Sequence, residues 1–507
     1  MKKLILLLLL VMSVVPVLPT SSHSSPDHGT LLLQEQESVQ MSTFQSSLNV
    51  TMPSIPSQEG YRTEYPVDGI EAVFDVFVAS NQLVWFSVLD DNQIWSLNRS
   101  SSEIRSYLLP ANVTPFLIKE DTDGSLWFTD YDFSPFKHYD GVVHFDPVTL
   151  NVTVYQLNIP KTGPFDILLT EGKVWFTQWI SGVAARLDPE SGQLSTVKFD
   201  NNKYSDLPCG PVGLTQVKNG KIWVVETLCS ILVEMDPSDM SYTLFRLPSD
   251  FYSPVFIQED SEGKLWTADH AGNRVLKFDP LTGEYETVLV VPPVGGVWGF
   301  AGINEVDLDS QGRLWFAEHF INRVGFYDTI NEVMYEFVLP QRDPLIQWID
   351  VNGTDLWYGV YTEGILGLIE GDLLPKVSIQ LEQEYSIGRV GRFSVPMEVS
   401  VGKDLIGSSA RSFADSEDRD QIFGTGSITK TIPQSGNFST SISVNIGNNI
   451  ELGTYHAVVG LDIQGLFITK QLTIGIQENL FFTVFIQGMG PVVLVYLVGF
   501  YKRDRKK

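Results

Sequence analysis

A tryptophan-centred phrase recurs seven times along this chain. In its best copy, residues 312–328, an apolar run around Trp315 ends at Glu318 and His319, and a polar turn then leads into a second apolar run. That order predicts a strand, a loop and a second strand. By subtraction of residue numbers, 42 to 49 residues separate successive tryptophans of the phrase, which are Trp85, Trp127, Trp175, Trp223, Trp266, Trp315 and Trp357.

A period of this length with several short strands per unit is typical of a β-propeller blade. Each unit divides into an apolar strand after Pro or Gly (residues 115–118, for example), the tryptophan strand, a strand that often ends in Asp-Pro, and an alternating outer strand such as residues 242–247. We therefore predict an all-β fold with a seven-bladed β-propeller over residues 61–374. A β-sandwich with chance similarity is the alternative, but it does not explain seven aligned tryptophans.

The two ends of the predicted ring fit each other. The unit around Trp357 has no outer strand of its own, because residues 371–375 are too short and too rich in Gly and Pro. Residues 61–67 resemble the outer strands of the other units. We predict that they complete the last blade, because such pairing removes the free sheet edges of an open ring.

Both ends of the chain carry targeting signals. Lys2 and Lys3 precede an unbroken apolar run and then small polar residues, which predicts a signal peptide over residues 1–22. Residues 479–501 carry no charge, are long enough for a bilayer of ~30 Å, and precede a basic tail over residues 502–507. This predicts a single-pass membrane helix with a cytoplasmic tail and an extracytoplasmic N-terminal part, a buried core helix being the alternative.

The segments on either side of the propeller differ in character. Residues 23–60 are rich in Ser, Gln and Pro without a sustained period, which predicts a flexible linker. Residues 375–477 lose the tryptophan phrase and alternate like short strands around a loop rich in Gly, Ser and Asp, residues 402–420. We predict an immunoglobulin-like β-sandwich stalk over residues 375–477.

Other features agree with a location outside the cell. Six Asn-X-Ser/Thr triplets are candidate glycosylation sites, at Asn49, Asn98, Asn112, Asn151, Asn352 and Asn437. The only two cysteines, Cys209 and Cys229, fall in loops at the same end of the fourth blade. They predict either a disulfide or two buried thiols.

The formal net charge of −27 argues against nucleic acid and anionic membrane surfaces as partners. It suits cations, basic ligands or a salty exterior, and solubility alone is the alternative explanation. Together with the short leader and the glycosylation triplets, it favours an archaeal cell surface. The chain has no phosphate-binding loop, nucleophile elbow, CxxC pair or HExxH motif, so no nucleotide or organic cofactor is indicated.

The candidate site comes from the residue three positions after each tryptophan, where the strand ends. Equivalent positions of a propeller lie on one circle, so we expect them to converge on the mouth of the central channel. Oxygen ligands of this kind favour Mg²⁺ or Ca²⁺. Alternatively, these acids cap strand ends and pair with Asn and Arg of the same loops. The seven residues are Val88, Asp130, Gln178, Glu226, Asp269, Glu318 and Val360.

Two histidines and two aromatic residues follow these positions directly. His270 follows Asp269 and His319 follows Glu318, so each imidazole is a candidate catalytic group beside an acid. Trp179 and Tyr131, with Gln178, are candidate ligand-facing residues. We expect a small molecule or a protein to bind on this face of the propeller.

The repeated phrase resembles that of the virginiamycin B lyase family, over roughly residues 61–372. The copies at residues 312–325 and 263–280 carry the resemblance best, followed by those at 124–147 and 172–189. The resemblance implies a seven-bladed propeller that opens a cyclic depsipeptide by elimination, with Mg²⁺ held by glutamates and a histidine base. Carried over to this chain, it makes His319 the base, His270 a substrate-binding residue, and the acids the metal ligands, namely Glu318, Asp269 and Glu226, with Asp130 as a further candidate.

One departure from the family pattern bears on activity. The lyases have one residue between the metal-binding Glu and the base, whereas Glu318 and His319 are adjacent, and neighbouring side chains of a strand point to opposite faces. We therefore favour a ligand-binding or interaction module at the cell surface. A divalent-metal-dependent lyase is the alternative, and a purely structural platform is a third.

Overall fold

The computed structural model describes residues 27–29, 35–53, 57–88, 92–131, 140–159, 161–200, 209–247, 253–290, 301–341, 345–388, 391–416, 422–425, 427–447 and 450–477. The predicted signal peptide, membrane helix and basic tail lie outside these residues. Within them, no helix has the length and apolar character needed to cross a membrane. Apart from Glu332–Met334, the chain divides into one compact unit that ends at Leu374 and a second that starts at Pro375.

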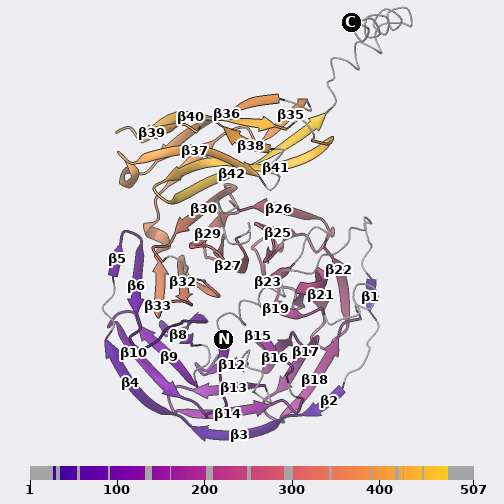
Figure 1. The fold of residues 1–507 in the computed structure, drawn as a ribbon. Helices are drawn as coiled ribbons and strands as arrows, with labels where there is room; N and C mark the ends of the chain where they lie inside the picture. Colours follow the sequence, from indigo (N-terminus) through magenta and orange to yellow (C-terminus); the bar gives the residue numbers. More distant parts are fainter. Residues whose placement is uncertain are drawn as a thin grey trace, which may run out of the picture. The chain divides into compact units, whose positions relative to one another are not determined.

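Seven antiparallel sheets form a ring in the first unit (Figure 1). The first strand of each sheet contacts the first strands of the neighbouring sheets, so the first strands lie innermost. The first four blades are β7 (Val76–Val78), β8 (Leu83–Ser87), β9 (Gln93–Asn98) and β10 (Glu103–Leu108); β11 (Pro115–Glu120), β12 (Leu126–Asp130), β13 (Gly141–Asp146) and β14 (Asn151–Gln156); β15 (Pro164–Thr170), β16 (Lys173–Gln178), β17 (Val183–Asp188) and β18 (Gln193–Lys198); β19 (Pro211–Gln216), β20 (Ile222–Glu226), β21 (Ile231–Met235) and β22 (Tyr242–Arg246), with the short helix η1 (Thr227–Cys229) after β20.

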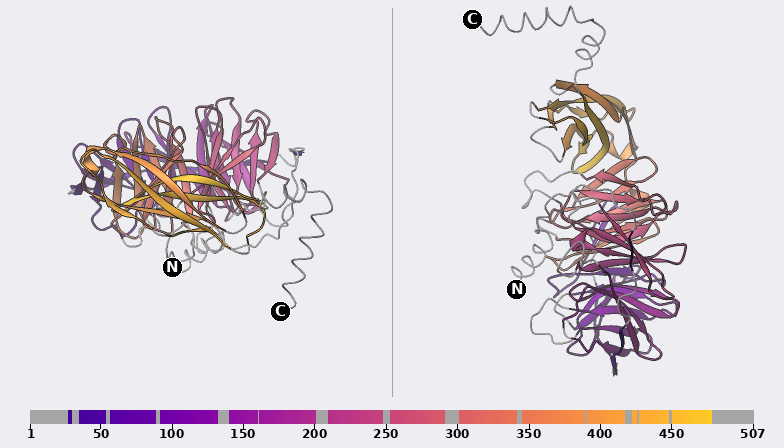
Figure 2. Two further views of the ribbon diagram at one scale, coloured as in Figure 1. Left: turned by 90° about the horizontal axis from the view of Figure 1, so that it is seen from above. Right: turned by 90° about the vertical axis from the view of Figure 1, so that its right-hand side faces the viewer.

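The ring is completed by three further blades. They are β23 (Pro254–Glu259), β24 (Leu265–Asp269), β25 (Arg274–Phe278) and β26 (Tyr285–Leu289); β27 (Ile303–Leu308), β28 (Arg313–Glu318), β29 (Arg323–Asp328) and β30 (Val333–Val338); β31 (Ile349–Asn352), β32 (Asp355–Val360), β33 (Ile365–Ile369) and β6 (Arg62–Pro66), with the short helix η2 (Gly371–Leu373) after β33. Strand β6 pairs antiparallel with β33, which confirms the predicted closure of the last blade by residues 61–67. Within the propeller, the strands run between the two faces of the ring (Figure 2).

The repeated tryptophans are the contacts between blades. Trp85 of blade 1 packs with Phe128 and Phe145 of blade 2, and Trp357 of blade 7 packs with Phe86 of blade 1. The indoles are almost fully buried. Each therefore belongs to two adjacent cores, and its burial stabilises the ring rather than one sheet, by roughly 25 cal/mol for each Å² of apolar surface removed from water.

An aspartate six residues before the tryptophan supports this packing in three blades. Asp121, Asp260 and Asp309 each accept a hydrogen bond from the indole nitrogen of Trp127, Trp266 and Trp315, at 3.2, 2.8 and 3.0 Å. Asp260 and Asp309 also accept backbone N–H groups of the turn that follows. The aspartate thus fixes both the turn and the ring orientation of the tryptophan.

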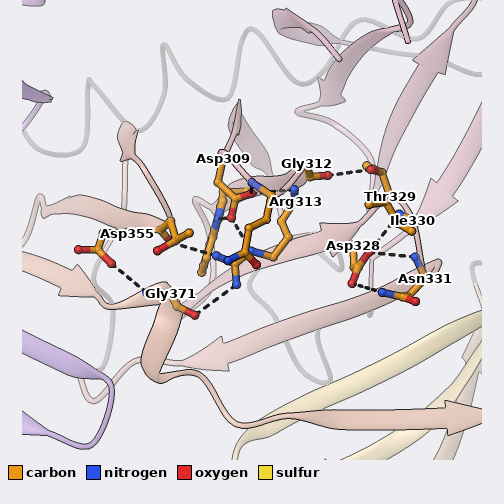
Figure 3. A network of polar contacts seen from close by, with 12 residues as sticks. Asp309, Gly312, Arg313, Asp328, Thr329, Ile330, Asn331, Asp355 and Gly371 are labelled. Carbon is orange, nitrogen blue, oxygen red and sulfur yellow. Dashed lines mark hydrogen bonds and ion pairs between the residues drawn. The ribbon is translucent and has the colours of Figure 1, made fainter. Parts of the chain in front are cut away.

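Arg313 joins blade 6 to blade 7 (Figure 3). Its guanidinium pairs with Asp309 and donates to the backbone oxygens of Gly371, at 3.3 Å, and Thr354, at 3.1 Å. Gly371 in turn donates its N–H to Asp355. In blades 3, 4 and 5 the equivalent residue is a lysine that pairs with the aspartate at the end of the third strand, so only blade 6 directs this cation to its neighbour.

Residues 23–60 do not form the predicted linker where the structure describes them. Instead, β1 (Asp27–Gly29), β2 (Glu35–Ser38), β3 (Gln40–Gln45), β4 (Ser47–Pro53) and β5 (Ser57–Glu59) follow one another around the ring. They pair antiparallel with β22, β18, β14, β10 and β6, and so add a fifth strand to five blades. We call these five strands the strap. Backbone groups of an outer strand pair with any extended segment, so a polar one suffices.

The second unit contains two β-sheets. One has the order β34 (Val377–Gln380), β36 (Gly391–Val401), β40 (Asn437–Ile446) and β38 (Ile422–Thr425). The other contains β42 (Leu466–Gln477), β41 (Gly453–Ile463), β37 (Ser409–Ser416) and β39 (Thr429–Thr431), with β35 (Glu384–Gly388) parallel to β42. Burial alternates along β36 and β40, as it does in a sheet with one face in a core. The loop predicted over residues 402–420 contains the short helix η3 (Lys403–Leu405) and all of β37.

Candidate functional site

The seven positions that follow the repeated tryptophans occupy equivalent places, as predicted. Asp130, Gln178, Glu226, Asp269 and Glu318 are the last residues of β12, β16, β20, β24 and β28, and all are buried. These are the second strands of their blades, so an innermost strand lies between each residue and the axis. Their convergence on the channel mouth stays a prediction.

Two of the acids are used to hold backbone in place. Asp130 Oδ1 accepts the N–H of Thr114 at 2.7 Å, and Asp269 Oδ1 accepts the N–H of Ser253 at 3.1 Å. Thr114 and Ser253 immediately precede β11 and β23, so each carboxylate fixes the chain where it enters the innermost strand. Asp269 Oδ2 also pairs with Arg274 Nε at 3.0 Å. This is the strand-capping role that the sequence left open.

Glu318 has a different environment. It is fully buried, and its carboxyl group lies beside that of Glu336. Burial and the negative charge of Glu336 raise its pKa well above the usual range, although Arg323 opposes them. Arg323 lies 3.1 Å from Glu336 and pairs with it. The raised pKa disfavours the ionised form of Glu318, which weakens it as a ligand for a divalent cation.

The donor set does not fit the Mg²⁺ or Ca²⁺ expected from the sequence. Asp130 and Asp269 already bind backbone N–H groups or an arginine, burial raises the pKa of Glu318, and Glu226 is fully buried. Across the described residues, no three His, Cys, Asp or Glu side chains lie together as a metal ion requires. Ca²⁺ takes six to eight oxygen ligands and Mg²⁺ takes six, several of them waters, but both need ionised carboxylates that converge on one point.

His270 and His319 do come together. Their ring centroids lie 5.7 Å apart, and Phe320 packs against both, at 5.5 Å and 4.5 Å. Nδ1 of His319 lies 3.2 Å from the backbone oxygen of Ile346. Because a carbonyl oxygen only accepts, this contact assigns the proton to Nδ1 and leaves a lone pair on Nε2, which has no partner.

Burial keeps both imidazoles neutral. It lowers the pKa of His270 to about 4, and burial together with His270 lowers the pKa of His319 to about 3. Nδ1 of His270 has no hydrogen-bond partner either, while the ring is hydrogen-bonded to the Ile303 backbone. Two adjacent imidazoles thus each present one unprotonated nitrogen in a buried site, an arrangement suited to accepting a proton or a hydrogen bond.

Aromatic rings close the axis near this end of the propeller. The indole of Trp348, just before β31, lies 5.1 to 6.3 Å from four phenylalanine rings that come from blades 1, 2, 3 and 5. A side chain of blade 7 can reach all four only if it lies on the axis. Sequence reasoning missed this plug, because Trp348 lies outside the repeated phrase. The four rings belong to Phe74, Phe116, Phe165 and Phe256.

Gln178 lines a small pocket beside blade 3. The pocket measures about 100 Å³ and is mostly apolar, and its other lining residues include Ile159, Val183 and Leu194. Ser181 donates its hydroxyl to Gln178 Oε1 at 2.9 Å. Trp179 follows and is half-buried with its indole nitrogen unpaired, whereas Tyr131 is buried and packs edge-on against Phe116. Of the three predicted ligand-facing residues, Gln178 therefore lies in a cavity wall and Tyr131 supports the plug.

The two cysteines are joined. A disulfide connects Cys209 and Cys229, whose Cα atoms lie 5.1 Å apart, so the structure contains the first of the two alternatives. Of the candidate glycosylation sites, Asn112, Asn151 and Asn437 are exposed, and Asn98 and Asn352 are half-buried. The side chain of Asn49 lies outside the described residues.

Comparison with known proteins identifies a family likeness in the propeller. Residues 54–289 match the model of the virginiamycin B lyase family. No match is found among curated protein sequences.

Several solved structures resemble the propeller. The crystal structure of virginiamycin B lyase from Staphylococcus aureus is 19% identical in sequence, with a TM-score of 0.53, over 61% of this chain and 98% of that chain. A streptogramin B lyase structure gives the same identity and TM-score over 61% of this chain and 99% of its own. A catalytically inactive form of the Staphylococcus aureus enzyme with quinupristin matches equally well, over 98% of its length. At this identity the likeness is one of fold.

Proposed function

The propeller of this chain belongs to the virginiamycin B lyase family, and from that premise we propose that it acts as a ligand-binding module at the cell surface. The pocket beside Gln178 carries this proposal. It is mostly apolar with a few polar side chains in its wall, among them Gln178 and Ser181, which is the usual composition of a small-molecule site. A volume of about 100 Å³ takes one branched or aromatic group of a larger ligand.

The lyase chemistry of the family has less support in these residues. Of the carboxylates that would hold a divalent ion, Asp130 binds a backbone N–H, Asp269 pairs with Arg274, and Glu318 has a raised pKa. Without such an ion, the enolate that forms during elimination lacks its usual counter-charge. A shared fold does not carry the activity with it.

A filled-pocket variant tests the binding proposal. Thr196→Trp places an indole in the pocket, and Thr153→Trp makes the same change on the outer strand of blade 2, away from the pocket. Ligand-observed NMR would screen short peptides and cyclic depsipeptides against both variants and the wild type. We expect compounds that bind the wild type and Thr153→Trp to lose binding to Thr196→Trp. If no compound binds, or if Thr196→Trp binds equally well, the proposal fails.

The cellular location is part of the proposal. A signal peptide over residues 1–22 and a membrane helix over residues 479–501 would leave the propeller outside the cell, on a stalk of residues 375–477. The disulfide and the exposed glycosylation triplets support this location, because disulfides persist in oxidising compartments. Protease digestion of intact cells would test it, since an extracytoplasmic propeller is cleaved without lysis.

Elimination at the histidine pair is a second candidate function. The unpaired Nε2 of His319 favours it, because a lone pair fixed by the Nδ1 contact can take the proton α to a carbonyl while the ester oxygen leaves. Chromatography with tandem mass spectrometry of a cyclic depsipeptide after incubation distinguishes the two functions, because elimination gives a linear product of unchanged mass whereas hydrolysis adds a water. Linear product that disappears with His319→Ala and persists with Lys198→Met, a change of an exposed lysine, would establish a lyase. Absence of product with the wild type would leave the binding module.

A further inference from the structure

A group of charged side chains lies along the axis, on the innermost strands that also carry the aromatic plug. Its one cation is Lys119 of β11. The carboxylates that act on it come from Asp75, just before β7, from Asp166 of β15, from Glu305 and Asp307 of β27, and from Asp350 of β31. We call these six residues the axial cage. They do not overlap with the predicted metal ligands or with the histidine pair.

The carboxylates of the cage join neighbouring blades. Asp75 Oδ2 accepts the N–H of Ile118 from blade 2 at 2.8 Å, and Asp350 Oδ2 accepts the N–H of Val78 from blade 1 at 2.7 Å. Three further bonds repeat this pattern: Asp166 with Leu214 at 2.9 Å, Glu305 with Ile349 at 2.7 Å, and Asp307 with Val351 at 3.2 Å. Every carboxylate of the cage therefore spans a boundary between two blades.

Among the residues that the structure describes, Lys119 is the one cation that acts on these five acids. Its ammonium lies 5.6 Å from the centre of the Phe77 ring of blade 1, a cation–π contact that orients it across the blade boundary. The surrounding carboxylates raise its pKa despite burial, so it stays charged. No titratable group of β19 or β23 joins the cage, because Glu259 at the end of β23 binds the backbone N–H of Lys218 instead. Asp309, which also acts on Asp307, is paired with Arg313.

Five acids around one cation cannot all be ionised without repulsion. We infer that the axial cage is a proton-linked lock, which binds protons in mildly acidic surroundings and then holds the blades together more strongly than at alkaline pH. Protonation removes repulsion between the carboxyls, and the carbonyl oxygen of a neutral carboxyl still accepts a backbone N–H. The lock acts on the whole ring, because its bonds include the boundary between blades 7 and 1.

The raised pKa values of the cage carboxyls determine whether the stability of the ring rises or falls with pH. Burial raises the pKa of Asp75 to about 8 and of Asp350 to about 7. It raises the pKa of Asp166 and Asp307 to about 6, and that of Glu305 well above its ordinary value. A carboxyl with a higher pKa in the folded than in the unfolded chain binds more protons when folded. Stability due to these groups is then gained as pH falls through about 8 to 6, and lost as it rises.

Thermal unfolding of the full chain between pH 6 and pH 9 tests the lock. We expect the Tm of the wild type to rise by about 5 °C or more on going from pH 9 to pH 6. Lys119→Met should lower the Tm more at pH 9 than at pH 6, because the ionised acids lose their only cation. The matched control, Lys198→Met, removes an exposed lysine of β18 and should shift the curve equally at both pH values.

A second variant keeps the test decisive if Lys119→Met does not fold. Asp350→Asn retains an oxygen for the Val78 N–H but removes one ionisable group, so its Tm should fall less than that of the wild type on going from pH 6 to pH 9. A slope of Tm against pH that is unchanged in Asp350→Asn would overturn the inference. So would a loss in Lys119→Met that is the same at pH 6 and pH 9.

Discussion

The ion pair between Asp269 and Arg274 in blade 5 is a buried contact that we expect to stabilise the fold. Asp269 is fully buried, Arg274 is nearly so, and the carboxylate also holds the N–H of Ser253. Removal of the arginine would leave a buried carboxylate without its counter-charge. We expect Arg274→Met to lower the free energy of unfolding by about 3 to 5 kcal/mol, measured by urea denaturation.

A surface pair provides the control for that prediction. Arg105 pairs with Glu103 at 3.0 Å on β10, where both side chains are substantially exposed. Arg105→Met should cost less than about 1 kcal/mol, because solvent screens the pair. Equal losses in Arg274→Met and Arg105→Met would show that Asp269 does not depend on its partner.

The same residues show why the site was harder to predict than the fold. An acid at the end of a buried strand gives one sequence pattern whether it binds a metal or a backbone N–H. Asp130 and Asp269 are distinguished from metal ligands only by the backbone N–H groups of Thr114 and Ser253 that donate to them. Thr114 and Ser253 lie 16 positions earlier in the chain, outside the pattern around each acid. The pairing of His270 with His319 was accessible, because both follow equivalent acids in adjacent blades.

The strap changes the expected behaviour of the blade edges. Its strands cover the outer strands of five blades through backbone pairing, and the side chains of β3 are mostly exposed. A chain that begins at Ser57 keeps β5 and β6 but exposes the edges of β10, β14, β18 and β22. We expect this truncated protein to self-associate, because unpaired edges recruit further strands. Light scattering during size-exclusion chromatography would show it.

A point change separates edge exposure from loss of chain length. Ser42→Pro removes one ladder N–H from β3, whose residue 42 pairs with Val154, and leaves the rest of the strap in place. It should show weaker self-association than the truncated protein. If the truncated protein stays monomeric at high concentration, the strap is not needed to protect these edges.

Strand β3 of the strap was not predictable from hydrophobic patterns for a physical reason, since its side chains are mostly exposed. A strand that pairs through its backbone while its side chains face water needs no alternation of apolar residues. The closing strand β6 was predictable, because Thr63 and Tyr65 alternate with residues at the surface and the unit around Trp357 lacked an outer strand. Sequence patterns therefore identified the elements that fill a core and missed those that add only backbone pairing.

At the scale of the whole molecule, the repeated tryptophan phrase predicted the ring of blades but not the side chains that fill its axis. Seven equivalent tryptophans specify seven equivalent interfaces, so the number of blades follows from counting. The seven blades are not equivalent at the axis, because a single side chain there must fill a space that all seven blades border. Trp348 and Lys119 each occupy such a place and have no counterparts in the other repeats.

The ring is closed by contacts between blade 7 and blade 1. Strand β6 joins β33 along five residues, and Arg99 of blade 1 pairs with Asp355 and Glu370 of blade 7, at 3.1 and 2.6 Å. A chain that begins at Asp68 lacks β6 and leaves Tyr65 absent from the core around Trp357. We expect it to lose cooperative unfolding, because blades 7 and 1 can then separate before the rest of the ring.

Scanning calorimetry distinguishes this outcome from simple destabilisation. A chain that begins at Gly60 keeps β6 and should unfold in one propeller transition, whereas the chain that begins at Asp68 should show a broader transition with a van't Hoff enthalpy well below the calorimetric value. Because both lack β1–β5, the difference between them isolates closure from the strap. One sharp propeller transition in both chains would mean that Arg99 and the Asp350 bond to Val78 close the ring without β6.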